Sequence, residues 1–278
     1  MSVTGEQGSR GKSDEAASGA ARDAEPVEGT WQEAAGAEGN PQDAGSAPER
    51  ELFGVRRELA EKFAERLLTD GVQRGLIGPR EGERLWERHL YNSAVLAELL
   101  PEGATVVDVG SGAGLPGIPL AIARPDLELT LLEPMARRVT WLEEIADELG
   151  LPLAVVRGRA EETSTRSRLY DFDYVVARAV SSLDRLAEWC LPLLRPGGWL
   201  LAQKGASAAE ELERDRASIE RRGGERAVVR ECGAAALRTP ANVVAIRRAE
   251  TPEPGAAGRK VNGSRARRAD NRRKRKER

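Results

Sequence analysis

Residues 108–117 read DVGSGAGLPG, a glycine-rich segment that is the most informative part of the sequence about the fold. It follows a short run typical of a β-strand, residues 104–109, and leads into a segment at 114–123 that can form a helix. Glycine lets the backbone pack closely against a ligand, and free N–H groups at the start of a helix can point at it. The pattern therefore predicts a ligand-binding loop between the first strand and the first helix of an α/β sheet.

Predicted strands and helices alternate on the carboxyl side of this loop. Further strands are predicted at 127–132, 153–156, 172–177 and 199–202, and helices at 136–149, 183–194 and 206–222. Two last strands, at 227–229 and 243–246, are joined by a glycine-containing link rather than a long helix, which permits antiparallel pairing. We expect an α/β fold with a mostly parallel seven-stranded sheet, covered on both faces, that binds its ligand at the carboxyl ends of the strands.

A helical cap is predicted ahead of the sheet. Apolar residues recur every three or four positions from Leu52 to Leu67, and a second helical segment spans 85–99 before Pro101 and Gly103 end it. The chain thus divides into four predicted parts. They are a disordered acidic segment at 1–50, the cap at 51–103, the sheet domain at 104–250 and a disordered basic tail at 251–278.

The formal net charge of −2 over 278 residues conceals a strong asymmetry. Residues 1–50 carry four Lys and Arg against ten Asp and Glu, whereas residues 255–278 carry eleven against two. Cys190 and Cys232 match no metal-ligand spacing and are expected to pack as small apolar residues, so no metal is predicted. Because no signal peptide and no membrane-length apolar run is visible, we expect a cytoplasmic protein away from membranes.

Two kinds of cofactor compete for the glycine loop. The GxGxxG spacing from Gly112 to Gly117 formally fits a dinucleotide. The alternative is S-adenosylmethionine, as in class I methyltransferases: Asp108 at the entry to the loop suits an ammonium-bearing ligand, and Gly110 directly follows the strand. Glu133 ends the next predicted strand, where its carboxylate suits the two hydroxyls of a ribose. These details favour S-adenosylmethionine and make Asp108, Gly110, Gly112 and Glu133 candidate cofactor contacts.

Four stretches together carry a closer resemblance. They are WERHLYNS at 86–93, DVGSGAGLPGIPLA at 108–121, Arg-Ala at 178–179 and Lys-Gly at 204–205. The chain resembles the small-subunit ribosomal RNA methyltransferase G family, also called the glucose-inhibited division protein B family, over roughly 52–248. The resemblance implies a class I methyltransferase that uses S-adenosylmethionine to methylate N7 of a guanine in the 530 loop of 16S rRNA.

The resemblance also assigns individual positions. It places cofactor contacts on Gly110 and Leu115, on Ala160 and Glu161 after the third predicted strand, and on Arg178 after the fourth. Arg178 is in addition the candidate catalytic residue, because a guanidinium there can orient the target base or a phosphate. A salt bridge on the rim of the sheet is the alternative for this arginine.

The remaining expectations concern partners. The substrate is expected to be 16S rRNA or the 30S subunit, with the basic tail contacting RNA phosphates and the enzyme acting as a monomer. His89 is expected to be packed and hydrogen-bonded, whereas Lys204 is open between a substrate contact and a solvated side chain. Three alternatives stay open: a methyltransferase for another acceptor, a non-catalytic RNA-binding or ribosome-assembly protein, and an NAD-dependent oxidoreductase.

Overall fold

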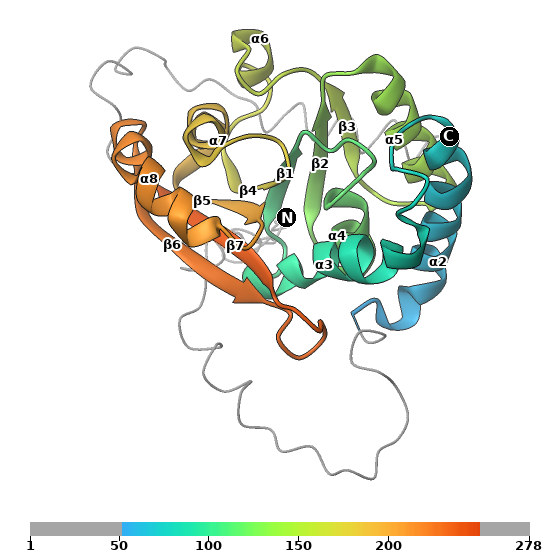
Figure 1. Cartoon of the computed structure of the whole chain (residues 1–278). Coiled ribbons are helices and arrows are strands. Elements are labelled where there is room, and N and C mark those ends of the chain that lie inside the picture. Colours follow the sequence, from blue (N-terminus) through green and yellow to red (C-terminus); the bar gives the residue numbers. More distant parts are fainter. Residues whose placement is uncertain (1–51, 251–278) are drawn as a thin grey trace, which may run out of the picture.

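The computed structural model describes residues 52–250, which form one seven-stranded sheet with helices on both faces (Figure 1). The strand order is β3-β2-β1-β4-β5-β7-β6. The strands are β1 (Thr105–Val109), β2 (Glu128–Glu133), β3 (Ala154–Arg157), β4 (Phe172–Arg178), β5 (Leu194–Lys204), β6 (Gly224–Cys232) and β7 (Ala241–Arg248). Strands β1 to β5 pair in parallel, while β7 pairs antiparallel with both β5 and β6. The predicted α/β class, the mostly parallel sheet and the antiparallel end are confirmed.

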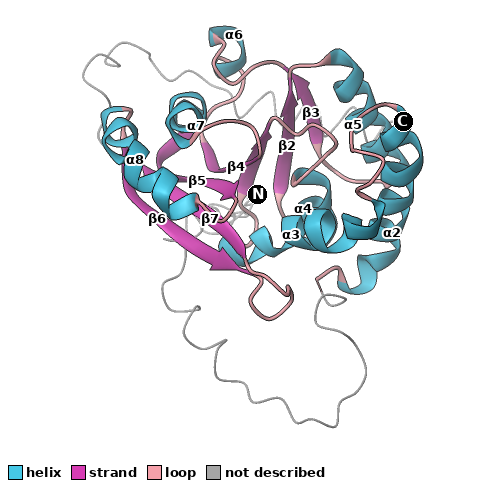
Figure 2. Ribbon diagram, in the orientation of Figure 1, coloured by secondary structure: helices cyan, strands magenta, loops and turns pink. Residues whose placement is uncertain are grey.

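The helices form two layers (Figure 2). They are α2 (Arg57–Arg66), α3 (Asn92–Ala94), α4 (Gly117–Ala123), α5 (Ala136–Glu148), α6 (Thr163–Arg166), α7 (Leu183–Cys190) and α8 (Ala208–Arg221). The cap packs with α4 and α5 against one face of the sheet, and α7 and α8 cover the other (Figure 1). The buried apolar residues of the cap therefore belong to the same core as those of α4, α5 and this face of the sheet.

Alternation along β4 explains why residues 174–177 form an unbroken run of largely apolar side chains. Tyr174 and Val176 join the core beneath the cap, whereas Val175 and Ala177 join the core beneath α7 and α8. A strand buried on both faces needs apolar side chains at every position. The near-continuous apolar runs thus mark the parallel strands correctly.

The cap consists of two nearly continuous helical segments. The first runs through a 3₁₀ turn η1 (Gly54–Arg56), α2 and a π-helical turn η2 (Leu67–Gly71). The second runs through η3 (Gly82–Arg84), η4 (Leu85–Tyr91), α3 and η5 (Val95–Leu99). Val55, which the periodicity places on the apolar face, is fully exposed. It lies in the 3₁₀ turn, whose tighter repeat takes it out of phase with the apolar face of α2.

Some predicted boundaries are wrong. The helix predicted at 183–194 ends earlier, in the 3₁₀ turn η6 (Leu191–Leu193), and β5 already begins at Leu194. A register irregularity between β4 and β5 absorbs the Pro-Gly-Gly segment at 196–198, so that β5 begins ahead of the predicted start at residue 199. The short helix α6 was not predicted. The predicted segments 1–50 and 251–278 lie outside the described residues.

Candidate active site at the carboxyl edge of the sheet

The glycine loop connects β1 to α4 and is tied to β2. The Gly110 N–H donates to the Leu132 carbonyl at 2.8 Å. Gly112 has a φ of +57°, a conformation that side chains disfavour, and its N–H donates to Glu133 Oε2 at 2.9 Å. A Cβ on Gly117 would lie 2.3 Å from Leu131 Cδ2 and 2.7 Å from Asp108 Oδ2. Glycine is thus required by backbone conformation at one position and by close approach at the other.

Asp108 lies on β1 beneath the loop and is fully buried. Its Oδ2 accepts a hydrogen bond from the Gly117 N–H at 3.1 Å, while its Oδ1 has no partner among the described residues. Burial raises the pKa of this carboxyl to about 7, although the hydrogen bond from the Gly117 N–H opposes the shift. A buried carboxylate oxygen without a partner is costly, and a ligand ammonium would complete it.

Glu133 ends β2 beside the same loop and is 1% exposed. Its Oε2 accepts from Gly112, its Oε1 accepts from the Met135 N–H at 2.9 Å, and the Arg138 guanidinium lies 3.9 Å away. These contacts fix the carboxylate, yet each oxygen has a second lone pair for a hydroxyl donor. The arrangement therefore suits the predicted contact with a ribose.

The other predicted cofactor residues, Leu115, Ala160 and Glu161, lie on loops. Leu115 is half-buried at the tip of the glycine loop, and its peptide bond to Pro116 is cis. Ala160 is buried after β3, and its carbonyl accepts from Arg166 Nε at 2.8 Å. The neighbouring Glu161 is exposed. The segment after β3 thus offers backbone groups at Ala160 and, at Glu161, an exposed carboxylate that lies 3.8 Å from the Arg159 guanidinium.

Arg178 ends β4 and points into the cap. Its Nη1 donates to the His89 carbonyl at 3.3 Å and to Ser93 Oγ at 3.1 Å. Its Nη2 donates to the Arg88 carbonyl at 3.0 Å and to His89 Nδ1 at 2.7 Å. Burial, together with the charge of Arg88, lowers the pKa of Arg178 to about 10. Within residues 52–250 no carboxylate forms an ion pair with this guanidinium, so the rim salt bridge considered for it is wrong.

Two neighbours on β5 add contacts that the sequence did not predict. Gln203, which pairs with Arg178 in the strand register, donates from Nε2 to the Asn92 carbonyl and to Asn92 Oδ1 at 3.1 Å. Lys204 donates to the Ser181 carbonyl at 2.6 Å and to Glu211 at 3.0 Å, and its side chain is 12% exposed. The alternative that Lys204 is a solvated side chain is therefore wrong. The only sequence signal at these positions was the resemblance, whose stretches include Asn92 and Lys204.

The comparison with known families decides the class of protein. The family model described as rRNA small subunit methyltransferase G matches residues 56–239. The chain belongs to this family. A relative from Mycolicibacterium paratuberculosis named ribosomal RNA small subunit methyltransferase G is 55% identical over 77% of this chain and 87% of its own length. A relative of the same name from Salinispora arenicola is 52% identical over 81% and 98%.

Membership of the methyltransferase G family confirms the predicted class I fold, the enzyme class and the cofactor. The chain is an S-adenosylmethionine-dependent methyltransferase, and the NAD-dependent alternative is wrong. The residues present fit this cofactor. The unpartnered Asp108 Oδ1 suits the ammonium of its methionine part, and the fixed Glu133 carboxylate suits its ribose.

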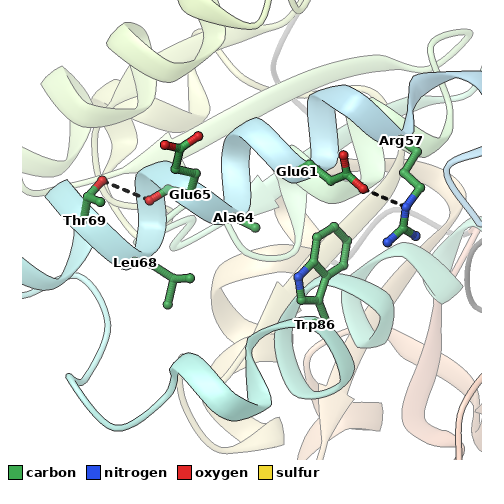
Figure 3. Close-up of a pocket in the computed structure, with 7 residues that line it drawn as sticks. All are labelled: Arg57, Glu61, Ala64, Glu65, Leu68, Thr69 and Trp86. Atoms are coloured by element: carbon green, nitrogen blue, oxygen red, sulfur yellow. Dashed lines mark hydrogen bonds and ion pairs between the residues drawn. The ribbon is translucent and has the colours of Figure 1, made fainter.

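A pocket of about 510 Å³ lies elsewhere, between α2 and η4 (Figure 3). Trp86 points from η4 toward α2, with the Arg57 guanidinium carbon 4.9 Å from its ring centroid. The lining residues are Arg57, Glu61, Ala64, Glu65, Leu68, Thr69 and Trp86. None of them is a predicted cofactor contact, so we place the active site at the glycine loop, where the buried polar groups converge, and not in this pocket.

The histidine and the two cysteines occupy the packed positions that the sequence predicts. His89 is packed and hydrogen-bonded, as predicted. Cys190 and Cys232 are buried, as predicted, and burial raises the pKa of the Cys232 thiol to about 12. Among residues 52–250, no group of three or more His, Cys, Asp and Glu side chains is arranged to hold a metal ion, and no helix is long and apolar enough to span a membrane.

Proposed function

We propose that this enzyme transfers the methyl group of S-adenosylmethionine to N7 of a guanine in the 530 loop of 16S rRNA. The relatives are named for small-subunit ribosomal RNA, which supports this class of acceptor. The observation that carries the proposal is that the buried Asp108 and the half-buried Arg178, two groups of opposite charge, lie at one edge of the sheet. Asp108 pairs with Val176 in the register of β1 and β4, so Arg178 lies two residues further along the adjacent strand.

The anionic part of this edge would hold the cofactor. Asp108 Oδ1 would accept from the ammonium, Glu133 would accept from the ribose hydroxyls, and Ala160 and Glu161 would face the adenine. The glycine-loop contacts are Gly110, Gly112 and Leu115. When bound, S-adenosylmethionine supplies an electrophilic methyl group on a sulfonium sulfur.

The cationic part of the edge would hold the acceptor. Guanine N7 carries a lone pair in the plane of the base, so the acceptor needs no deprotonation and the enzyme needs no general base. Arg178 would orient the base or its phosphate and restrict N7 to a productive geometry. Orientation of this kind can supply about 7 kcal/mol or more in good intramolecular reactions.

The test is transfer of labelled methyl to 16S rRNA and to 30S subunits that lack the modification. The product is mapped by chain cleavage at N7-methylguanine. We expect one labelled guanine in the 530 loop, and the better of the two substrates shows whether free RNA or the assembled subunit is used. Labelling at another base, or none despite cofactor binding, would refute the proposal.

The basic tail at 251–278 lies outside the described residues, and we propose that it binds RNA phosphates while the enzyme acts as a monomer in the cytoplasm. Each phosphate contact releases counterions, so the logarithm of the affinity falls linearly with that of the salt concentration. A chain ending at residue 250 is expected to bind RNA more weakly, with a shallower salt slope and unchanged cofactor affinity. Equal slopes with and without the tail would refute this role.

A further inference from the structure

A chain of three polar side chains runs from the cap to the end of β4. Glu81 Oε2 lies 2.8 Å from His89 Nε2, and His89 Nδ1 lies 2.7 Å from Arg178 Nη2. The three residues come from the N-terminal side of η3, from η4 and from β4, so the contact depends on docking of the cap onto the sheet. The His89 side chain is 13% exposed, which shields the contacts from water.

The partners fix the tautomer of His89. A guanidinium has only N–H donors, so Nδ1 must accept the hydrogen bond from Arg178 and cannot carry a proton. A neutral imidazole then carries its proton on Nε2, which donates to the Glu81 carboxylate. A proton on Nδ1 would face the Arg178 donors and break this contact.

The charges around His89 favour its neutral form. Burial lowers its pKa, Glu81 opposes that shift, and Arg178 and Arg88 add to it. The carboxyl of Asp108 on β1 also acts on Arg178 and raises the pKa of the guanidinium, against the effect of burial. The imidazole is therefore an acceptor for Arg178 at neutral pH.

We propose that His89 is a positioning residue for methyl transfer, which holds the Arg178 guanidinium through Nδ1 while Glu81 holds His89 in the Nε2–H tautomer. This inference rests on the proposed role of Arg178 at the acceptor side of the site. His89 takes no proton from the acceptor in this account. Its loss changes the orientation of Arg178 and leaves the cofactor contacts at Asp108 and Glu133 in place.

The tautomer is tested first, because His89 is the single histidine of the chain. Long-range ¹⁵N–¹H NMR of the untagged full-length protein reports that one ring without assignment. We expect the Nε2–H tautomer at neutral pH, and a higher pKa of His89 in Arg178→Gln, which removes a neighbouring positive charge. An Nδ1–H tautomer, or the same pKa in both proteins, would overturn the proposal.

Activity is tested with a matched pair of substitutions. In His89→Asn, the side-chain amide reaches about as far as Nδ1 and offers Arg178 an acceptor there. In His89→Gln, the amide reaches further, toward the position of Nε2, and leaves no acceptor at the position of Nδ1. At saturating S-adenosylmethionine, we expect His89→Asn to keep a rate close to that of the parent at neutral pH. The rate of the parent should fall at acid pH, because a proton on Nδ1 breaks the contact with Arg178, and His89→Asn should lack this fall. We expect kcat to drop about 100-fold in His89→Gln, because Arg178 loses its acceptor and a misplacement of its guanidinium by about 1 Å can have that effect.

Thermal unfolding of both variants separates positioning from packing. Similar melting temperatures with a large difference in kcat would support positioning. Equal losses of rate in the two variants would overturn it. If the parent enzyme transfers no methyl group to rRNA or to 30S subunits, the proposed function fails, and the NMR comparison with Arg178→Gln still decides the contact.

Discussion

The two halves of the carboxyl edge are built in different ways. The β1–β2 half carries buried carboxylates, Asp108 and Glu133, whose hydrogen-bond donors are backbone N–H groups within 21 residues along the chain. The β4–β5 half carries Arg178 and Gln203, whose partners lie 85 to 111 residues away in the cap. The anionic half is therefore a local construction, and the cationic half exists only when the cap is docked.

This difference suggests a division of labour. The anionic half leaves one carboxylate oxygen unpartnered for a cationic ligand. The cationic half holds a guanidinium without a carboxylate partner among the described residues, which suits an electron-rich base or a phosphate. Substitutions in the two halves should then affect cofactor binding and methyl transfer separately.

The largest expected effect is at Arg178. Arg178→Gln keeps an amide donor and removes the charge, so kcat should fall about 100- to 1,000-fold, as for loss of one electrostatic contact in a transition state. The matched control is Arg216→Gln, which removes a surface ion pair with Glu213 on α8. Steady-state rates of methyl transfer measure both. A kcat of Arg178→Gln equal to that of the parent would show that the cationic half does not act in methyl transfer.

Asp108→Asn tests the role of the anionic half in cofactor binding. A hydrogen bond to a charged group contributes about 1.5–3 kcal/mol, so the Kd for S-adenosylmethionine should rise about 10- to 100-fold above pH 7. The parent should bind the cofactor more tightly as pH rises through about 7, where Asp108 ionises, and the variant should lack this trend. Calorimetric titrations at pH 6 and pH 8 measure it.

The same substitution should stabilise the ligand-free chain. The pKa of Asp108 is raised in the folded state, so the parent loses stability as pH rises from about 4 through about 7. Asp108→Asn escapes this loss and should gain on the order of 1–4 kcal/mol at pH 8. Denaturant unfolding at pH 5 and pH 8 checks the sign, and a gain that is larger at pH 5 would contradict the raised pKa.

The smallest effect concerns the loop that supports Asp108. Gly117→Ala forces a Cβ against Leu131 and the Asp108 carboxylate, so it should cost about 1–3 kcal/mol of stability. Gly205→Ala is the control, because a Cβ there meets nothing within 4 Å. Chemical denaturation compares the two variants. Equal stabilities would show that the loop has room to adjust.

The difference between the halves also explains what the sequence could predict. Asp108, Gly112 and Glu133 were identified because strand ends and glycine spacing are local signals, and the structure brings these three together. Arg178 was identified only through the resemblance. Its contacts with residues 88–93 follow from packing of the cap, which no local pattern encodes. The shift of the β5 start to Leu194 likewise depends on pairing with β4.

The division of labour is tested most directly by one rate measurement. Single-turnover methyl transfer to 30S subunits is followed against S-adenosylmethionine concentration for Asp108→Asn and Arg178→Gln. If the two halves act separately, excess cofactor restores the rate of Asp108→Asn to near that of the parent and leaves Arg178→Gln slow at every concentration. Rescue of Arg178→Gln by cofactor, with Asp108→Asn remaining slow at saturation, would contradict this division of labour.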